Sequence, residues 1–151
     1  MHLAKILVPV DFSGESKKAI QYAIAFARQF GASIVLLHVV EPIVYPSDVG
    51  YGPVVVQVPN NSAIKKARAR LSALGKKQAG EKILVETTVL TGSPHFEITE
   101  AAKALKIDLI IVGTHGYTGL NHALMGSTAE KVVRHAPCPV FIVRKKEHEF
   151  V

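Results

Sequence analysis

The sequence predicts an α/β protein built on a doubly wound, five-stranded parallel sheet with helices on both faces. Five short apolar segments, typical of buried strands, alternate with four segments whose apolar residues recur at helical spacing. Strands that alternate with helices form parallel βαβ units. Because such crossovers are right-handed, we expect a doubly wound sheet whose strands lie in the spatial order 3-2-1-4-5.

The composition is that of one globular domain spanning residues 1–151. Hydrophobic residues make up 48% and charged residues 20%, which excludes a disordered chain. No apolar run approaches the ~20 residues of a membrane span, and the N-terminus lacks the apolar core of a signal peptide. Cys138 is the single cysteine, so no intrachain disulfide forms and the expected compartment is the cytoplasm. The net charge of +6 permits nucleic-acid, membrane or phosphorylated partners without selecting one.

The first strand and helix are predicted from residues 4–10 and 14–30. Pro9 should end the strand, because proline cannot donate a hydrogen bond inside a sheet. Ser13 is the expected N-cap of the helix and Gly31 its C-cap. The apolar residues at helical spacing are Ala19, Ile20, Ala23, Ile24, Ala27 and Phe30.

The second strand is predicted at residues 33–40, and the segment after it is harder to assign. Residues 41–60 contain four prolines and two glycines, so we expect a long loop or lid there. Ser62 is the expected cap of a second helix, in which Gly75 would cost about 1 kcal/mol relative to alanine and favours an early end. The inward-facing residues of this helix are expected to be Ile64, Ala67, Leu71 and Leu74.

The rest of the chain supplies three strands and two helices. The strands are predicted at residues 82–89, 108–112 and 139–144. Ser93 should cap the third helix, with Pro94 at its first position. The apolar positions are Ile98, Ala101, Ala102 and Leu105 in the third helix, and Ala129, Val132, Val133 and Ala136 in the fourth.

A glycine-rich segment follows the fourth strand and carries the strongest functional signal. Its spacing is Gly113-x2-Gly116-x9-Gly126, with Ser127 opening the next helix. Glycines let the backbone approach an anion, and a helix start offers unpaired N–H groups and the positive end of the helix dipole. The spacing matches neither the Walker A nor the GxGxxG motif. The alternative is a surface loop whose glycines only form turns.

The predicted topology brings a second residue to this glycine loop. In the order 3-2-1-4-5, strands 1 and 4 are neighbours whose chains depart toward opposite faces, and ligands of open α/β sheets bind at this switch point. Asp11 follows strand 1 and Gly113 follows strand 4, so they should meet at one crevice. Asp11 would contact a ribose or a cation there; alternatively, it only caps the following turn.

The chain resembles the universal stress protein family over nearly its whole length. The motifs that carry the resemblance are Ile6-Leu7-Val8-Pro9-Val10-Asp11-Phe12-Ser13, Leu37-His38-Val39, Gly92-Ser93-Pro94, Gly113-Thr114-His115-Gly116 with Gly126-Ser127, and Pro137-Cys138-Pro139-Val140. The spacing G-x2-G-x9-G-[ST] is typical of the ATP-binding branch of the family, which the chain resembles. The resemblance implies a Rossmann-like fold of the adenine nucleotide alpha hydrolase type.

The resemblance also implies a set of nucleotide-binding residues. Pro9, Val10 and Asp11 would border the adenosine, and Val39 and Val112 would line the adenine. Gly113, Thr114, His115 and Gly116 would run beside the ribose and phosphates, and Gly126, Ser127 and Thr128 would hold phosphate oxygens. The implied ligand is ATP, with or without Mg²⁺. Family members commonly dimerise through the last strand, which implies a homodimer through Val140–Val143.

Several of these residues have a plainer interpretation. Ser127 is also a favoured helix cap, and His115 is also an ordinary loop histidine. His38 is expected to be a satisfied structural histidine, and Cys138 an inert packing residue. The seven histidines show no metal-binding spacing. The basic run from Lys65 to Lys77 is usually a solvated helix face, so nucleic acid is an unlikely partner and a membrane is not expected.

Three functions follow from the sequence as hypotheses. The favoured one is a nucleotide-binding regulatory module of the stress-response type. The second is a slow, Mg²⁺-dependent ATPase, which lacks an evident lysine cradle, Walker-B-like carboxylate or water-orienting base. The third is a basic nucleic-acid-associated protein, whose binding would weaken steeply with salt.

Overall fold

The computed structural model describes residues 3–48, 53–78, 83–114 and 125–144. In chain order they form β1 (Lys5–Pro9), α1 (Gly14–Phe30), β2 (Ser33–Val40), β3 (Ile43–Asp48), β4 (Pro53–Val58), α2 (Asn61–Gln78), β5 (Val85–Thr91), α3 (Pro94–Ala104), β6 (Leu109–Gly113), α4 (Ser127–His135) and β7 (Val140–Val143). The five predicted strands therefore correspond to β1, β2, β5, β6 and β7.

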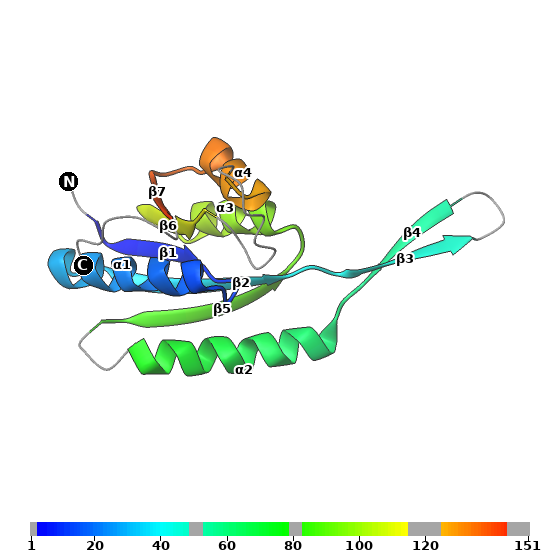
Figure 1. The fold of residues 1–151 in the computed structure, drawn as a ribbon, viewed down its shortest axis with the longest axis horizontal. Helices are drawn as coiled ribbons and strands as arrows, with labels where there is room; N and C mark the ends of the chain where they lie inside the picture. Colours follow the sequence, from blue (N-terminus) through cyan, green and yellow to red (C-terminus); the bar gives the residue numbers. More distant parts are fainter. Residues whose placement is uncertain (1–2, 49–52, 79–82, 115–124, 145–151) are drawn as a thin grey trace.

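These five strands form one parallel sheet in the order β5-β2-β1-β6-β7 (Figure 1). Numbered along the chain without β3 and β4, this order is 3-2-1-4-5, so the predicted fold class and strand order are confirmed. β1 lies at the centre and pairs with β2 on one side and β6 on the other. Its neighbour β6 is followed by α4, whereas β1 is followed by α1, which lies on the opposite face of the sheet.

The alternation of side chains along the central strands builds two separate cores. Ile6 and Val8 of β1 pack with residues of α1 and α2, whereas Leu7 packs with residues of α3 and α4. All three side chains are 0% exposed. Burying each such side chain contributes roughly 1.5–3 kcal/mol. Burial on both faces explains why β1 is a continuous apolar run rather than an alternating one.

Helix α1 begins and ends as predicted. The Ser13 hydroxyl accepts a hydrogen bond from the Ser16 N–H at 3.2 Å. Gly31 ends the helix with a φ of 70°, a left-handed conformation that glycine adopts without a steric penalty. The apolar residues at helical spacing are buried except Phe30, which is 47% exposed at the end of the helix.

The expectation of a loop or lid at residues 41–60 is wrong. Strands β3 and β4 pair antiparallel, from Ile43↔Val58 to Asp48↔Pro53, and the hairpin projects from the body of the protein (Figure 1). The loop was predicted because the segment contains four prolines, but proline is excluded only from strands that have a neighbour on both sides. In a two-stranded sheet both strands are edges, so Pro46 and Pro53 are tolerated.

Helix α2 differs from the prediction at its start and at its end. Asn60 caps it, with its side-chain oxygen accepting the Ala63 N–H at 3.0 Å, so the expected cap Ser62 is wrong. The helix continues past Gly75 to Gln78. A Cβ at Gly75 would lie 2.7 Å from Thr87 Cγ2 of β5, so the glycine allows helix and strand to approach closely.

The remaining differences concern boundaries and faces. Strand β5 begins three residues later than predicted, at Val85, and ends at Thr91. Ser93 and Pro94 occupy the predicted first positions of α3, but the Ser93 hydroxyl contacts His95 Nδ1 at 3.1 Å instead of capping the helix. In α4, Val132 is buried whereas Val133 is 42% exposed. No helix in the described parts of the chain is long and apolar enough to cross a membrane.

Candidate functional site

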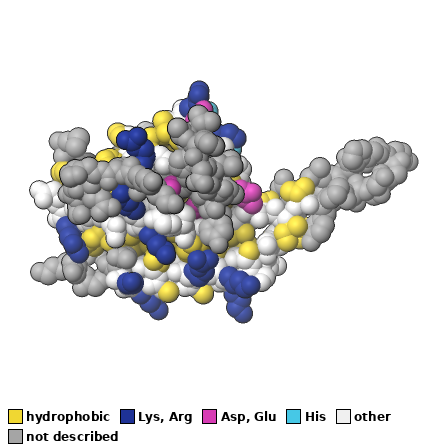
Figure 2. Space-filling view, viewed as in Figure 1, with side chains coloured by type: hydrophobic (Ala, Val, Ile, Leu, Met, Phe, Trp, Pro, Cys, Tyr) yellow, Lys and Arg dark blue, Asp and Glu magenta, His cyan; other side chains and the backbone are white. Residues whose placement is uncertain are grey.

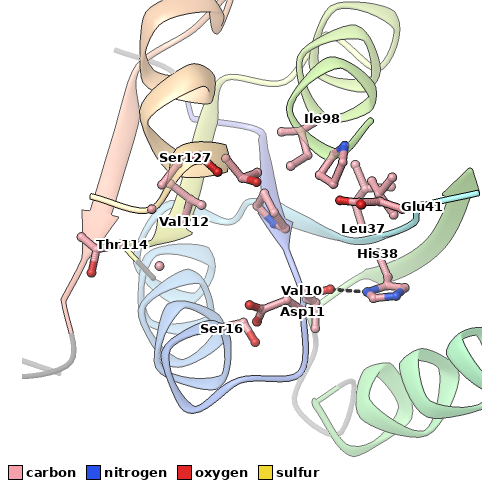
Figure 3. Close-up of a pocket in the computed structure, with 17 residues that line it drawn as sticks. Val10, Asp11, Ser16, Leu37, His38, Glu41, Ile98, Val112, Thr114 and Ser127 are labelled. Carbon is pink, nitrogen blue, oxygen red and sulfur yellow. Dashed lines mark hydrogen bonds between the residues drawn. The ribbon is translucent and has the colours of Figure 1, made fainter. Parts of the chain in front are cut away.

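A cavity of about 400 Å³ opens at the carboxyl ends of β1 and β6 (Figure 3). This is the switch point of the sheet, and the volume lies in the range of roughly 300–1,000 Å³ that small-molecule sites occupy. The residues that line it are Pro9, Val10, Asp11, Ser16, Leu37, His38, Val39, Glu41, Pro94, Ile98, Val112, Gly113, Thr114, Gly126, Ser127, Thr128 and Ala129.

The start of α4 forms one end of the cavity. Gly126 is the N-cap, with φ −59° and ψ 145°, and Ser127 is the first helical residue. The alternative in which Ser127 is an ordinary helix cap is therefore wrong. Within the described residues no side chain caps this helix. Ser127, Thr128 and Ala129 of this first turn line the cavity. The N–H groups of a helix's first turn have no partner within the helix and carry the positive end of its dipole, which suits an anion.

Backbone hydrogen bonds fix the position of this helix start. The Gly126 N–H donates to the Thr114 carbonyl at 2.6 Å, and the Thr114 N–H donates to the Val143 carbonyl at 2.9 Å. The first bond joins the residue after β6 to the residue before α4. Thr114 is itself 5% exposed. The helix start is thus tied to the end of β6 and, through Thr114, to the end of β7.

Gly113 has a structural reason to be glycine. A Cβ built there would lie 2.9 Å from Glu15 Cβ and 3.3 Å from the Glu15 carbonyl carbon. The end of β6 therefore passes directly against the first turn of α1. This packing brings the ends of β1 and β6 to the two sides of one cavity, as the topology predicts.

Asp11 both caps the turn and faces the cavity. One carboxylate oxygen accepts the Ser13 N–H at 3.0 Å, so the capping interpretation is correct. The residue is half-buried and lines the cavity between β1 and α1 (Figure 3). The two roles coexist because a carboxylate has two oxygens and about four acceptor sites.

The opposite end of the cavity is mostly apolar. Leu37 of β2 and Ile98 of α3 are buried there, whereas the buried Val112 of β6 lies beside Ser127 (Figure 3). His38 Nδ1 lies 2.6 Å from the Val10 carbonyl oxygen (Figure 3). Because a carbonyl oxygen only accepts, Nδ1 carries the proton, and His38 is a satisfied structural histidine that also lines the cavity. The cavity therefore has a dipolar end at α4 and an apolar end beside β2 and α3.

The structure brings most of the predicted site residues together. All of them line the cavity except His115 and Gly116, which lie outside the described residues. The residues that sequence reasoning missed are Ser16, Leu37, His38, Glu41, Pro94, Ile98 and Ala129. The topology argument followed the ends of strands 1 and 4, and the family resemblance added only Val39 of strand 2. The order of strands 2, 1 and 4 could also have placed the end of β2 at this crevice.

The surroundings of Cys138 do not favour a reactive thiol. Burial raises the pKa of the Cys138 thiol, and the Asp108 carboxylate raises it further, whereas a backbone hydrogen bond at Ile110 lowers it. A raised pKa disfavours the reactive thiolate, in agreement with an inert packing role. Among the described residues, no group of three histidine, cysteine or carboxylate side chains is placed to hold a metal ion.

Fold and cavity together define a doubly wound α/β domain with a ligand-sized cavity at its switch point. The chain belongs to the universal stress protein family, whose family model matches residues 2–144. A universal stress protein of Methanocaldococcus jannaschii is 35% identical over 150 residues, covering 96% of this chain and 84% of its own. The solved universal stress protein UspA of Lactobacillus plantarum has a TM-score of 0.78 and 26% identity, covering 95% of this chain and 99% of its own.

Two more distant solved structures of the family contain nucleotides. The universal stress protein of Archaeoglobus fulgidus was solved in complex with dAMP, with a TM-score of 0.69 and 21% identity, covering 95% of this chain and 99% of its own. Another universal stress protein was solved in complex with cAMP, with a TM-score of 0.69 and 22% identity, covering 97% of this chain and 100% of its own. At these identities the likeness to this chain concerns the fold.

Proposed function

We propose that this protein is a regulatory module of the stress response that binds ATP in the switch-point cavity. The observation that carries the proposal is the polarity of that cavity, with an uncapped helix start at one end and an apolar wall at the other. Phosphates and a purine base require such a pair of environments. The dAMP and cAMP complexes of family members support an adenine nucleotide as the ligand.

The proposal assigns the phosphates, the base and the ribose of the ligand to different residues of the cavity lining. Gly126, Ser127 and Thr128 hold phosphate oxygens through backbone N–H groups and hydroxyls. The base lies against Val39 and Val112, and Asp11 accepts from ribose hydroxyls. The proposal also keeps the remaining predicted nucleotide contacts. Those to the adenosine are made by Pro9 and Val10, and those to the ribose and phosphates by Gly113, Thr114, His115 and Gly116.

Magnesium would enter this site as part of the ligand. Mg²⁺ keeps several waters and binds through one or two carboxylates together with phosphate oxygens. Asp11 and Glu41 are the carboxylates among the described residues that line the cavity. In the proposed arrangement Asp11 faces the ribose and Glu41 lies beside Leu37, away from the helix start (Figure 3), so Mg²⁺ would be held mainly by triphosphate oxygens and water, and the two carboxylates are too few to form a protein site by themselves.

A slow ATPase is the alternative function of the same cavity. The described lining contains no lysine or arginine to stabilise charge on a transferred phosphoryl group. The one histidine in it, His38, already donates its Nδ1 proton to Val10. We therefore expect turnover to be slow or to need a partner, and the regulatory function to depend on binding.

The proposed module also forms a homodimer through β7, which is an edge strand of the sheet. A parallel partner bonds alternate residues of a strand, and the carbonyls of Pro139 and Val143 accept from Ile110 and Thr114 of the β6 side. The backbone groups of Val140 and Ile142 accordingly face outward. Such an edge is a template for pairing with a second copy of the chain.

The basic face of α2 is the feature that favours the third hypothesis, nucleic-acid association. Lysine and arginine side chains gather along the edge of the molecule formed by α2 (Figure 2). The exposed cations on this helix are Lys65, Lys66, Arg68, Arg70, Lys76 and Lys77. Exposed lysines and arginines along one helix are common on ordinary solvated surfaces, so this feature alone selects no partner.

Equilibrium titration with ATP, AMP, cAMP and GTP tests the proposal, beside an assay of phosphate release. We expect ATP to bind, GTP to bind more weakly, and phosphate release to stay near that of buffer. Comparable binding of all four ligands would contradict recognition of adenine. Rapid turnover would instead favour the ATPase. Binding of duplex DNA that falls steeply with salt and survives Gly126→Val would favour the third hypothesis.

A further inference from the structure

Three side chains form a continuous contact from the surface of α2 to the wall of the cavity. The guanidinium carbon of Arg70 lies 4.0 Å from the centroid of the Phe12 ring. The Phe12 and His38 rings lie 4.8 Å apart, centroid to centroid, at an angle of 43°. His38 in turn donates to the Val10 carbonyl at 2.6 Å and lines the cavity. Neither Arg70 nor Phe12 is among the described residues that line the cavity itself.

Phe12 has a backbone conformation that needs external support. Its φ is 66°, in the left-handed region that bulky residues rarely adopt. Such a conformation persists only where the surroundings hold it. The residue lies between Asp11, which faces the cavity, and Ser13, which caps α1. The half-buried ring contacts both the His38 ring and the cation of Arg70.

We propose that Arg70 is a positioning residue for the nucleotide, acting on the cavity through Phe12. This inference rests on the proposed function. The Arg70 guanidinium attracts the face of the Phe12 ring and so holds the turn after β1 in its strained conformation. Without it, the turn populates other conformations in which Asp11 and His38 are displaced. The apparent dissociation constant then rises as the competent fraction of the protein falls.

Arg68 provides a matched control on the same helix. It is an exposed cation two residues from Arg70, and no aromatic contact of its side chain is found among the described residues. Neutralising Arg68 or Arg70 changes the net charge equally. A loss of affinity that arises from long-range attraction of phosphates would therefore appear in both variants, whereas positioning through Phe12 would appear only at Arg70.

The first test measures the dissociation constant for ATP by calorimetry in the wild type, Arg70→Gln, Arg70→Lys and Arg68→Gln at one salt concentration. We expect Arg70→Gln to bind about three- to tenfold more weakly, and Arg70→Lys, which keeps a cation over the ring, to recover part of the loss. Arg68→Gln should stay within about twofold of the wild type. Because Arg70 is exposed, its variants should fold and melt close to the wild type.

A second test observes the contact directly. The chain contains no tryptophan, so Phe12→Trp introduces a single tryptophan, which can be excited selectively over the four tyrosines and keeps an aromatic face for Arg70. In this background Arg70→Gln should shift the emission before any ligand is added, and ATP should shift it in the Arg70 protein. Phe12→Leu, which removes the ring, should weaken binding as Arg70→Gln does. The two losses should not add, since both remove one interaction.

The outcomes separate this inference from the proposed function. Wild-type binding with an unchanged constant in Arg70→Gln, or an equal loss in Arg68→Gln, overturns the role of Arg70 alone. Additive losses from Phe12→Leu and Arg70→Gln also overturn it. Absence of ATP binding by the wild type overturns the proposed function and this inference with it.

Discussion

Gly113 and Gly126 belong to the same predicted loop motif, yet the structure gives them different reasons to be glycine. Gly113 lies against the first turn of α1, where a Cβ would contact Glu15. Gly126 has dihedral angles that any residue adopts, and it lies at the cavity where α4 begins. A glycine motif read from sequence therefore combines a packing requirement with a proposed ligand contact, and substitutions can separate the two.

Gly113→Ala should lower the stability of the fold. The added Cβ would lie 2.9 Å from Glu15 Cβ and 3.3 Å from Glu15 backbone, which cannot rotate away. Overpacking of this kind costs about 1–3 kcal/mol, measurable by urea unfolding. Gly14→Ala is the control, because a Cβ at Gly14 meets no heavy atom within 4 Å. If both variants unfold at the wild-type urea concentration, the close approach of β6 and α1 is incorrect.

Cys138 should react slowly with alkylating reagents in the native protein. Burial raises the pKa of its thiol, so at neutral pH less thiolate is present than in the unfolded chain. The rate of iodoacetamide labelling, followed by mass spectrometry, should rise only at a more alkaline pH than in urea. By linkage, this group favours the fold below the unfolded pKa, and that contribution is lost as the pH rises through the native pKa. Equal native and denatured labelling rates would contradict the buried environment.

Among single helices and strands, the sequence predicted those boundaries that are determined by residues at the boundary itself. The caps Ser13 and Gly31 delimit α1 as expected, because each acts through its own side chain or dihedral angles. The extent of α2 was not predictable in this way. Its glycine is explained by Thr87 of β5, a residue twelve positions further along the chain that only the folded sheet brings near.

A double-mutant cycle tests that explanation. Gly75→Ala alone should bring no gain, because the helix propensity of alanine, worth about 1 kcal/mol, is offset by contact with Thr87 Cγ2. In a Thr87→Ser background, which lacks that methyl group, Gly75→Ala should stabilise the protein by up to about 1 kcal/mol. Urea unfolding of the four proteins gives the coupling free energy. A coupling near zero would show that α2 and β5 are not in contact at this point.

The projecting hairpin of β3 and β4 could not be predicted from its own segment of the sequence. The valine run of β4 was recognised as β-like, but the prolines around it favoured a loop. Whether a proline ends a strand depends on whether that strand has a neighbour on its N–H side, which is a property of the sheet and not of the segment. The absence of a third strand beside β3 or β4 in the described structure could not be read from the sequence.

At the scale of the whole molecule, the strand order determines where the site lies. The order of β2, β1 and β6 places three strand ends and the start of α4 around one cavity. The order was predictable because the alternation of strands and helices leaves few topologies. The contributions of Leu37, His38 and Glu41 were missed because only Val39 of that segment was assigned to the site, although all three follow from the position of β2 beside β1.

Ile142→Pro should dissociate the proposed dimer without unfolding the protein. The hydrogen bonds to β6 alternate along β7, so the Ile142 N–H faces outward and its loss breaks no bond within the sheet. Sedimentation of the wild type should show a dimer and that of the variant a monomer. Phe141→Pro is the contrasting variant, since its N–H faces β6 and its loss should destabilise the fold. A dimer that survives Ile142→Pro would require a different interface.

The most direct test of the nucleotide-binding proposal is thermal unfolding of the wild type and of Gly126→Val, each with and without Mg-ATP. Ligand at one hundred times its dissociation constant adds about 2.7 kcal/mol, which predicts a rise in Tm of about 5–10 °C for a chain of this size. Gly126→Val should fold, because φ at this position is −59°, but show no rise, because an added side chain would obstruct the close approach of phosphates to the backbone that the proposal requires. An equal rise in both proteins, or no rise in the wild type, would contradict nucleotide binding at the start of α4.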